Sequence, residues 1–130
     1  MPAALIEVRR DYSAEEAQAL IDALHAAMVS ALEIPADDRI VRLVTHSPAC
    51  FACPPGKAHP ARFTLIGIDL FAGRSVAAKR RLYAAIVEHL APLGIPADHI
   101  LVRLNEIPRE NWGVRGLPAS EVDLGFKVEV

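Results

Sequence analysis

Residues 32–44 of this 130-residue chain read LEIPADDRIVRLV, and residues 93–105 read LGIPADHILVRLN. Aligned without gaps at an offset of 61 positions, the two stretches are identical at eight of thirteen positions. A match of this density within one short chain indicates two copies of a single structural unit, and such a repeat decides the fold. We therefore predict one domain over residues 1–130, with a first copy at 2–45 and a second at 62–105.

The first copy contains the signals of a strand, a helix and a second strand, in that order. The short apolar run Ala4–Val8 is typical of a strand. Ser13 stands three residues before Glu16, which is the capping-box arrangement of a helix start, and apolar residues then recur with the 3.6-residue period of a helix. Pro35 ends the predicted helix, and Arg39–Val44 supplies the return strand.

The second copy repeats this order of elements. Phe63–Phe71 is the predicted strand, Ser75 is the predicted helix cap, and Gly94 and Pro96 end the helix before a return strand at Ile100–Leu104. A helix that crosses between two strands makes those strands parallel. Two such β-α-β units predict an α/β chain arranged as an α+β two-layer sandwich, with a four-stranded mixed sheet and both helices on one face.

Two segments lie outside the repeat. Residues 46–61 contain four prolines, so we expect an ordered but irregular loop. The tail over 106–130 begins irregularly, and the alternation of apolar residues in Leu124–Val130 predicts an additional C-terminal strand with one buried face. No third layer remains to cover the second face of the sheet, and oligomerisation through that face is the simplest cover.

The composition excludes several classes of protein. The chain is 52% hydrophobic, which excludes intrinsic disorder, and its net charge of −2 leaves no broad basic surface for nucleic acid. No apolar run approaches the roughly 20 residues that a membrane span requires. Two cysteines are too few for a secreted disulfide scaffold. We expect a cytoplasmic protein with no nucleic-acid or membrane partner.

Two cysteines and two histidines in the proline-rich loop raise the question of a metal. Cys50 and Cys53, flanked by His46 and His59, offer four possible zinc ligands. Their spacing matches no standard zinc finger, and the segment lacks the helix that would lower a thiol pKa for redox chemistry. A plain loop is the preferred interpretation and a zinc-dependent interaction module the alternative.

Four short motifs, taken together and in order, resemble the tautomerase superfamily. They are Met1-Pro2 at the head of the first strand, Pro35-Ala36-Asp37-Asp38-Arg39 between helix and strand, Ala72-Gly73-Arg74-Ser75 before the second helix, and Asn111-Trp112-Gly113 in the tail. The likeness extends over the whole chain and is greatest to the long-chain members, such as malonate semialdehyde decarboxylase and cis-3-chloroacrylic acid dehalogenase. It implies a homotrimer in which the uncovered sheet faces line a central barrel.

The resemblance also implies roles for individual residues. Removal of Met1 would expose the secondary amine of Pro2 as the catalytic acid and base. Arg74 matches the arginine that binds the substrate carboxylate, and Asp38 matches the aspartate of the decarboxylase. Trp112 and Val114 match an aromatic and a hydrophobic position in the wall of the substrate pocket.

The chain departs from the family pattern at two places. Some relatives carry a second arginine before the second helix, where this chain has Phe71 and Ala72. The dehalogenase has a tyrosine on the last repeat strand, where this chain has Arg103. Dehalogenation is therefore the least expected of the known activities, and Phe71 and Arg103 join the candidate substrate-binding residues.

These residue types suit proton transfer next to a carbonyl group. A free α-amino group titrates near about 7.7–8.0 in peptides, and apolar walls and a nearby guanidinium lower its pKa. Such an amine can take a proton from the carbon beside a carbonyl and return it elsewhere, which is tautomerisation. Arg74 directly precedes the predicted helix cap, where an anion is favoured, and can orient a carboxylate by bidentate pairing.

The sequence thus predicts a cofactor-free tautomerase that acts on a small 2-oxo carboxylic acid. A decarboxylase of the malonate semialdehyde type is the first alternative, because a protonated amine can polarise the carbonyl of a β-keto acid as carbon dioxide leaves. A non-catalytic trimeric binding protein is the second alternative.

Overall fold

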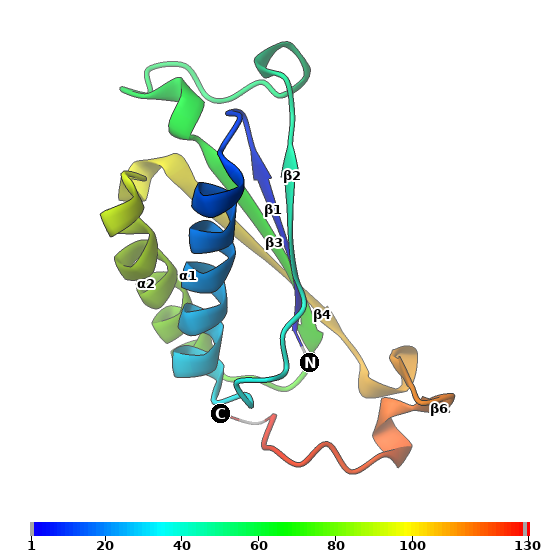
Figure 1. Cartoon of the computed structure of the whole chain (residues 1–130). Coiled ribbons are helices and arrows are strands. Elements are labelled where there is room, and N and C mark those ends of the chain that lie inside the picture. Colours follow the sequence, from blue (N-terminus) through cyan, green and yellow to red (C-terminus); the bar gives the residue numbers. More distant parts are fainter. Residues whose placement is uncertain (1, 129) are drawn as a thin grey trace.

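The computed structural model describes residues 2–128 and 130. Two helices lie side by side and cover one face of a four-stranded sheet, as Figure 1 shows. The elements are β1 (Ala3–Val8), α1 (Ala14–Leu32), β2 (Val41–Thr45), β3 (Thr64–Phe71), α2 (Val76–Leu90) and β4 (Ile100–Ile107), followed by the two-residue strands β5 (Gly113–Val114) and β6 (Leu117–Pro118). The predicted two-layer architecture with two β-α-β units is confirmed.

The order of strands in the sheet is β2-β1-β3-β4. Strands β1 and β2 are parallel, as are β3 and β4, and the central pair of β1 and β3 is antiparallel. Each parallel pair belongs to one repeat, and the antiparallel pair joins the repeats into a mixed sheet. Arg42 and Arg103 are aligned with each other in the two repeats. Arg42 pairs with Leu5 on β1 and Arg103 pairs with Gly67 on β3, so the two arginines occupy equivalent positions on the two outer strands.

Both helices begin at the caps that the sequence predicts. Ser13 Oγ accepts a hydrogen bond from the Glu16 N–H at 3.1 Å, and Glu16 Oε1 accepts one from the Ser13 N–H at 3.0 Å, which completes the capping box of α1. Ser75 Oγ accepts from the Ala78 N–H at 3.0 Å and caps α2. Helix α1 ends at Leu32, three residues before Pro35, at a left-handed Glu33.

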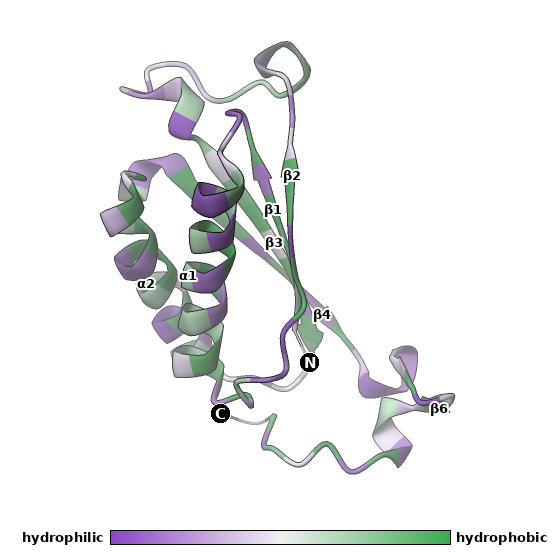
Figure 2. Ribbon diagram, viewed as in Figure 1, coloured by the Kyte–Doolittle hydropathy of each residue, from purple (hydrophilic) through white to green (hydrophobic). Residues whose placement is uncertain are grey.

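The hydrophobic core lies between the helices and the sheet. In Figure 2 both helices alternate hydrophobic and hydrophilic patches, as amphipathic helices do. Burial of one such aliphatic side chain contributes about 1.5–3 kcal/mol. The largest fully buried members of this core include Ile6, Leu20, Leu24, Met28, Leu32, Ile66, Ile68, Leu70, Leu82, Ile86 and Leu90.

Among residues 2–128 and 130, no element covers the other face of the sheet. Val44 on β2 is 41% exposed and Leu101 on β4 is 57% exposed. Strand β4 runs to Ile107, beyond the predicted end at Leu104, because β3 pairs with it as far as the Phe71–Ile107 pair.

The C-terminal strand prediction is wrong. None of the described residues in 124–130 belongs to a strand. The alternation of apolar residues correctly indicates that one side of the tail is buried. The tail buries these residues by packing them against other side chains and not by pairing as a strand. Phe71 and Val128 are the centre of a second small core, and Val130 O accepts hydrogen bonds from the N–H and the Oγ of Ser75 at 3.2 and 2.9 Å. The tail is thereby held against the start of α2.

The loop over 46–61 is irregular, as its prolines predict, and it contains one short 3₁₀ turn at Pro48–Cys50 and the beginning of a second at Pro60–Arg62. The guanidinium of Arg9 orders it by donating from Nε to Phe51 O at 2.5 Å and from Nη1 to Pro60 O at 2.7 Å.

The zinc alternative for this loop is not supported. Cys50 and Cys53 are free thiols, His46 Nε2 lies 3.2 Å from Glu7 Oε1, and the ring of His59 lies against that of His99. Within residues 2–128 and 130, no three His, Cys, Asp or Glu side chains are grouped to hold a metal ion. In the same residues, no helix is both long enough and apolar enough to span a membrane.

Candidate active site

The segments that carry all the candidate residues except Arg103 meet at one end of the sheet. In Figure 1 the N-terminus, the loop after α1 and the C-terminal tail all lie at this end. Pro2 is buried and immediately precedes β1. The Ala4 N–H donates to Ile40 O at 3.0 Å, so the loop that carries Asp38 runs beside the beginning of β1.

A cavity of about 340 Å³ lies at this end and brings Asp38 and Val114 together from distant parts of the chain. Its size is near the lower limit for small-molecule sites. Asp38 is half-buried, and its N–H donates to Pro35 O at 3.0 Å, which makes a local turn. The lining residues are Pro35, Asp37, Asp38, Val114, Arg115, Val122, Asp123, Leu124 and Phe126.

Arg115 lines this cavity and was not singled out by sequence reasoning. It is the first residue of the two-residue turn between β5 and β6, with φ of 51°, and Gly116 follows with φ of 81°. Left-handed geometry at both turn residues is typical of a tight hairpin, and it is uncommon for a residue other than glycine. The Arg-Gly pair after Val114 was the available signal. The turn brings a positive charge to a wall that also holds three aspartates.

Arg74 lies between β3 and α2 and is only 5% exposed. Its Nη1 donates to the main-chain oxygen of Leu32, the last residue of α1, at 2.8 Å. This contact places the guanidinium beside the end of α1, next to the loop that leads to Asp38. Arg74 thus lies at the same end of the sheet as Pro2, and its guanidinium is held there by the main chain of the first repeat.

Phe71 and Trp112 lie against each other rather than in the wall of the Asp38 cavity. Their ring centroids are 5.2 Å apart with planes at 72°, which is a favourable edge-to-face arrangement. Phe71 is 1% exposed, and Trp112 Nε1 donates to Ile107 O at 3.2 Å. The pair forms part of the second core and fixes the tail to the end of β4.

Arg103 lies on the uncovered face of the sheet, over Gly67. A Cβ atom added at Gly67 would be 2.5 Å from Arg103 Nη2, so the absence of a side chain at position 67 makes room for this guanidinium. The structure therefore groups Asp38 with Val114 and Phe71 with Trp112, and it places Pro2 and Arg74 at the same end. Arg103 is on a separate surface.

A family model described as a tautomerase enzyme matches residues 38–115, more than half of the chain. The chain belongs to the tautomerase superfamily. The chain is 37% identical over 57 residues to the "Probable tautomerase RSp0893" of Ralstonia nicotianae. This match covers 43% of the present chain and 81% of the relative. A shorter relative of this kind is expected if the present chain holds two copies of one unit.

Two solved structures resemble the superfamily chain over most of its length. The FG41 malonate semialdehyde decarboxylase inhibited by 3-bromopropiolate is 32% identical, with a TM-score of 0.71 over 85% of this chain and 87% of that one. A wild-type fused 4-OT, named R7 and solved as an asymmetric trimer, is 28% identical, with a TM-score of 0.81 over 91% of this chain and 96% of that one. The tautomerase-superfamily fold and membership among its enzymes are thereby established.

Proposed function

We propose that this enzyme catalyses the keto–enol tautomerisation of a small 2-oxo carboxylic acid, with the amine of Pro2 as general acid and base after removal of Met1. The observation that carries the proposal is the place of Pro2, which is buried at the head of β1 beside the Asp38 loop, at the end of the sheet that holds the cavity. Membership in the tautomerase superfamily supports the reaction class.

In this mechanism the Pro2 nitrogen takes a proton from the carbon beside the substrate carbonyl. The electron pair of the broken C–H bond forms the carbon–carbon double bond of the enolate, and the protonated Pro2 amine then gives that proton to the enolate oxygen, which completes the enol. The reverse sequence returns the proton from Pro2 to carbon. No cofactor takes part in this chemistry.

Arg74 is proposed as the group that binds the substrate carboxylate. Its contact with Leu32 O holds the guanidinium in place before substrate arrives. A fixed guanidinium loses less conformational entropy on pairing with a carboxylate, and a fixed carboxylate orients the reacting carbon toward Pro2. Val114, which lines the cavity, is proposed to bound the apolar side of the substrate. Phe71 and Trp112 are proposed to support this wall from the second core, against which Val114 packs. Arg103, on the uncovered face of the sheet, would contribute only to a site that a neighbouring subunit shares.

We further propose that the chain forms a homotrimer through the uncovered face of its sheet. Val44 and Leu101 are large apolar residues exposed on that face, and another subunit would remove them from water. The similar fused 4-OT structure is that of a trimer. In this assembly Arg103, which lies over Gly67, would face a neighbouring subunit.

Decarboxylation of a substrate like malonate semialdehyde is the second candidate function. The likeness to FG41 malonate semialdehyde decarboxylase and the half-buried Asp38 in the cavity favour it. In this reaction the protonated amine of Pro2 would polarise the carbonyl, the bond to the carboxylate would break, and its electrons would form an enol that takes a proton at carbon. A trimer that binds a carboxylate without catalysis is the third candidate.

Two assays on one preparation separate these functions. Mass spectrometry of the native N-terminus first shows whether Pro2 is the terminal residue, as the proposal requires. Ketonisation of phenylenolpyruvate and decarboxylation of malonate semialdehyde are then measured side by side. We expect faster ketonisation; a faster decarboxylation selects the second candidate. An intact trimer with neither activity selects the binding protein, and retention of Met1 in the native enzyme contradicts the role of Pro2.

A further inference from the structure

Two arginines converge on one tyrosine at the end of the molecule opposite the candidate active site. The guanidinium carbons of Arg10 and Arg62 lie 5.4 and 5.8 Å from the centre of the Tyr12 ring. Arg10 and Tyr12 precede α1, and Arg62 belongs to the short turn before β3. In Figure 1 these segments lie at the far end from both termini, together with the segment that follows α2.

The two arginines line one cavity of about 520 Å³. Its lining residues are Arg10, Ala58, His59, Pro60, Ala61, Arg62 and Gly94, none of them acidic. Within residues 2–128 and 130, neither Arg10 nor Arg62 is within ion-pair distance of a carboxylate. Two positive charges in one cavity repel each other, and an anion bound between them removes that repulsion.

Glu16 is a carboxylate whose pKa is lowered in part by the two arginines, and it is already engaged in the capping box of α1. The Ser13 N–H hydrogen bond to Glu16 is the main reason that the pKa of Glu16 is lowered, with Arg10 and Arg62 as smaller contributions. Glu16 lines a neighbouring cavity rather than the one with the two arginines. The arginine cavity therefore keeps room and charge for an external anion.

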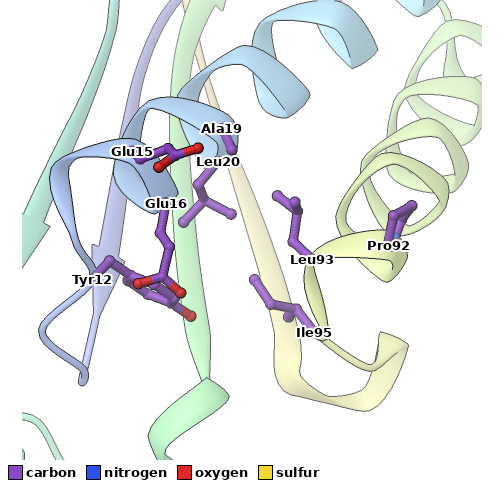
Figure 3. Close-up of a pocket in the computed structure, with 8 residues that line it drawn as sticks. All are labelled: Tyr12, Glu15, Glu16, Ala19, Leu20, Pro92, Leu93 and Ile95. Atoms are coloured by element: carbon purple, nitrogen blue, oxygen red, sulfur yellow. The ribbon is translucent and has the colours of Figure 1, made fainter.

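The neighbouring cavity of about 300 Å³ is largely apolar, and Figure 3 shows its side chains. It is lined by Tyr12, Glu15, Glu16, Ala19, Leu20, Pro92, Leu93 and Ile95. The two cavities adjoin. Tyr12, in the apolar cavity, contacts both arginines of the other one. Gly94, in the arginine cavity, lies in the chain between Leu93 and Ile95 of the apolar cavity. Arg62 Nη1 also lies 3.5 Å from Leu93 O.

We propose that these adjoining cavities form a second small-molecule site, which binds a carboxylate with an apolar body. The carboxylate lies between Arg10 and Arg62, where planar guanidinium groups match its geometry. The apolar body lies against Leu93 and Ile95 beside the Tyr12 ring. The Tyr12 hydroxyl is buried and has no hydrogen-bond partner within residues 2–128 and 130, so the same wall also holds an unused polar group.

Octanoate is the probe for this site, and the full-length protein is the sample. In an amide NMR titration we expect shifts at Leu93, Gly94 and Ile95 and at Arg62, with smaller changes around Pro2. Calorimetry then gives the affinity. Octanol, which has the same chain and no charge, should bind at least tenfold more weakly, as should acetate, which has the charge and no chain.

Paired variants test the charge. The double variant Arg10→Ala/Arg62→Ala should weaken octanoate binding at least tenfold. The control Arg80→Ala/Arg81→Ala removes the same charge from exposed positions of α2 and should bind within twofold of the wild type. Equal affinity of the first double variant and the wild type, or shifts confined to residues around Pro2, would overturn the proposal.

A variant at the apolar cavity keeps the test decisive if the arginine variant does not fold. Ala19→Leu adds volume to the wall of the apolar cavity on a half-buried face of α1, and it changes no charge. It should weaken octanoate binding at least fivefold and leave the ketonisation rate unchanged. Unchanged octanoate binding in this variant would contradict the place assigned to the apolar body.

Discussion

Arg74 donates a hydrogen bond from Nη1 to the main-chain oxygen of Leu32 at 2.8 Å and so connects the second repeat to the end of the first repeat's helix. The last carbonyl groups of a helix lack donors within the helix, and a positive charge is favoured beside them. Helix α1 has no basic residue in its last turn. Arg74 supplies both the donor and the charge, in addition to its proposed role in binding substrate.

Replacement of Arg74 by alanine should therefore change two quantities. The free energy of unfolding should fall by about 1.5–3 kcal/mol, the range for a hydrogen bond to a charged group, and KM for a 2-oxo acid should rise at least tenfold. Arg74→Lys keeps the positive charge but lacks the planar guanidinium group. We expect it to restore most of the lost free energy of unfolding but to leave KM raised. Urea unfolding and steady-state kinetics measure the two effects. An unchanged KM would limit Arg74 to its contact with α1.

Replacement of Pro2 by alanine should lower kcat/KM by about 100-fold or more, the scale for loss of a well-matched general base. The primary amine of alanine would occupy a similar place with a different basicity. The thermal midpoint should change little, because the strand pairing of β1 begins at Ala3. Pro54→Ala, in the exposed part of the loop, is the matched control. Full activity in Pro2→Ala would contradict a requirement for the secondary amine of proline.

The substitution Leu101→Glu should dissociate the proposed trimer. Leu101 is 57% exposed on the uncovered face, and a carboxylate there would have to lose its water between the subunits, at a large cost. Val76 is 61% exposed at the start of α2, on the covered side of the sheet, so Val76→Glu should leave the assembly intact. Sedimentation velocity distinguishes the two results. A Leu101→Glu trimer as stable as the wild type would place the interface elsewhere.

Loss of the α1 cap should destabilise the fold without a change in the site. Ser13→Ala removes the acceptor for the Glu16 N–H and should lower the free energy of unfolding by about 1 kcal/mol. Ser30→Ala changes the same residue type at an exposed position inside α1, where alanine is the better helix former. This control should be neutral or slightly stabilising, and chemical denaturation compares the two. Equal effects would show that the capping box contributes nothing.

Stability should decrease as the solution becomes acidic. Three exposed carboxyls have a lowered pKa: that of Glu16 by the Ser13 N–H hydrogen bond, that of Asp22 by the Arg39 hydrogen bond, and that of Asp98 by the His99 hydrogen bond. Since folding lowers these pKa values, their contribution is complete above the ordinary values of 4.5 for Glu and 3.8 for Asp and is lost as the pH falls through the folded values.

The thermal midpoint should therefore be constant above about pH 5 and decline toward about pH 3. Asp22→Asn removes one of the three groups and should have the shallower decline over that interval. Calorimetry at a series of pH values gives both curves. A midpoint that rises on acidification would contradict the sign of all three shifts.

Several elements followed from local sequence alone. The repeated Pro-Ala-Asp segments located both returns to the sheet, and Ser13 and Ser75 located both helix starts, because a cap depends on residues within one turn. The motif Arg74-Ser75 likewise placed a charge before α2. Strand ends were less accurate, since the length of β4 depends on the partner that β3 provides.

Other features were decided by contacts between distant segments. The alternation of apolar residues in the tail correctly predicted that one side of the tail is buried. Only the packing of the second core around Phe71 determined that these residues are buried without forming a strand. The same is true of Arg115, which reaches the Asp38 cavity through a turn, and of Arg62, which meets Tyr12 across the fold. The physical reason is range: periodicity and capping act over a few residues, whereas a cavity or a buried guanidinium depends on which surfaces come together when the two repeats pack.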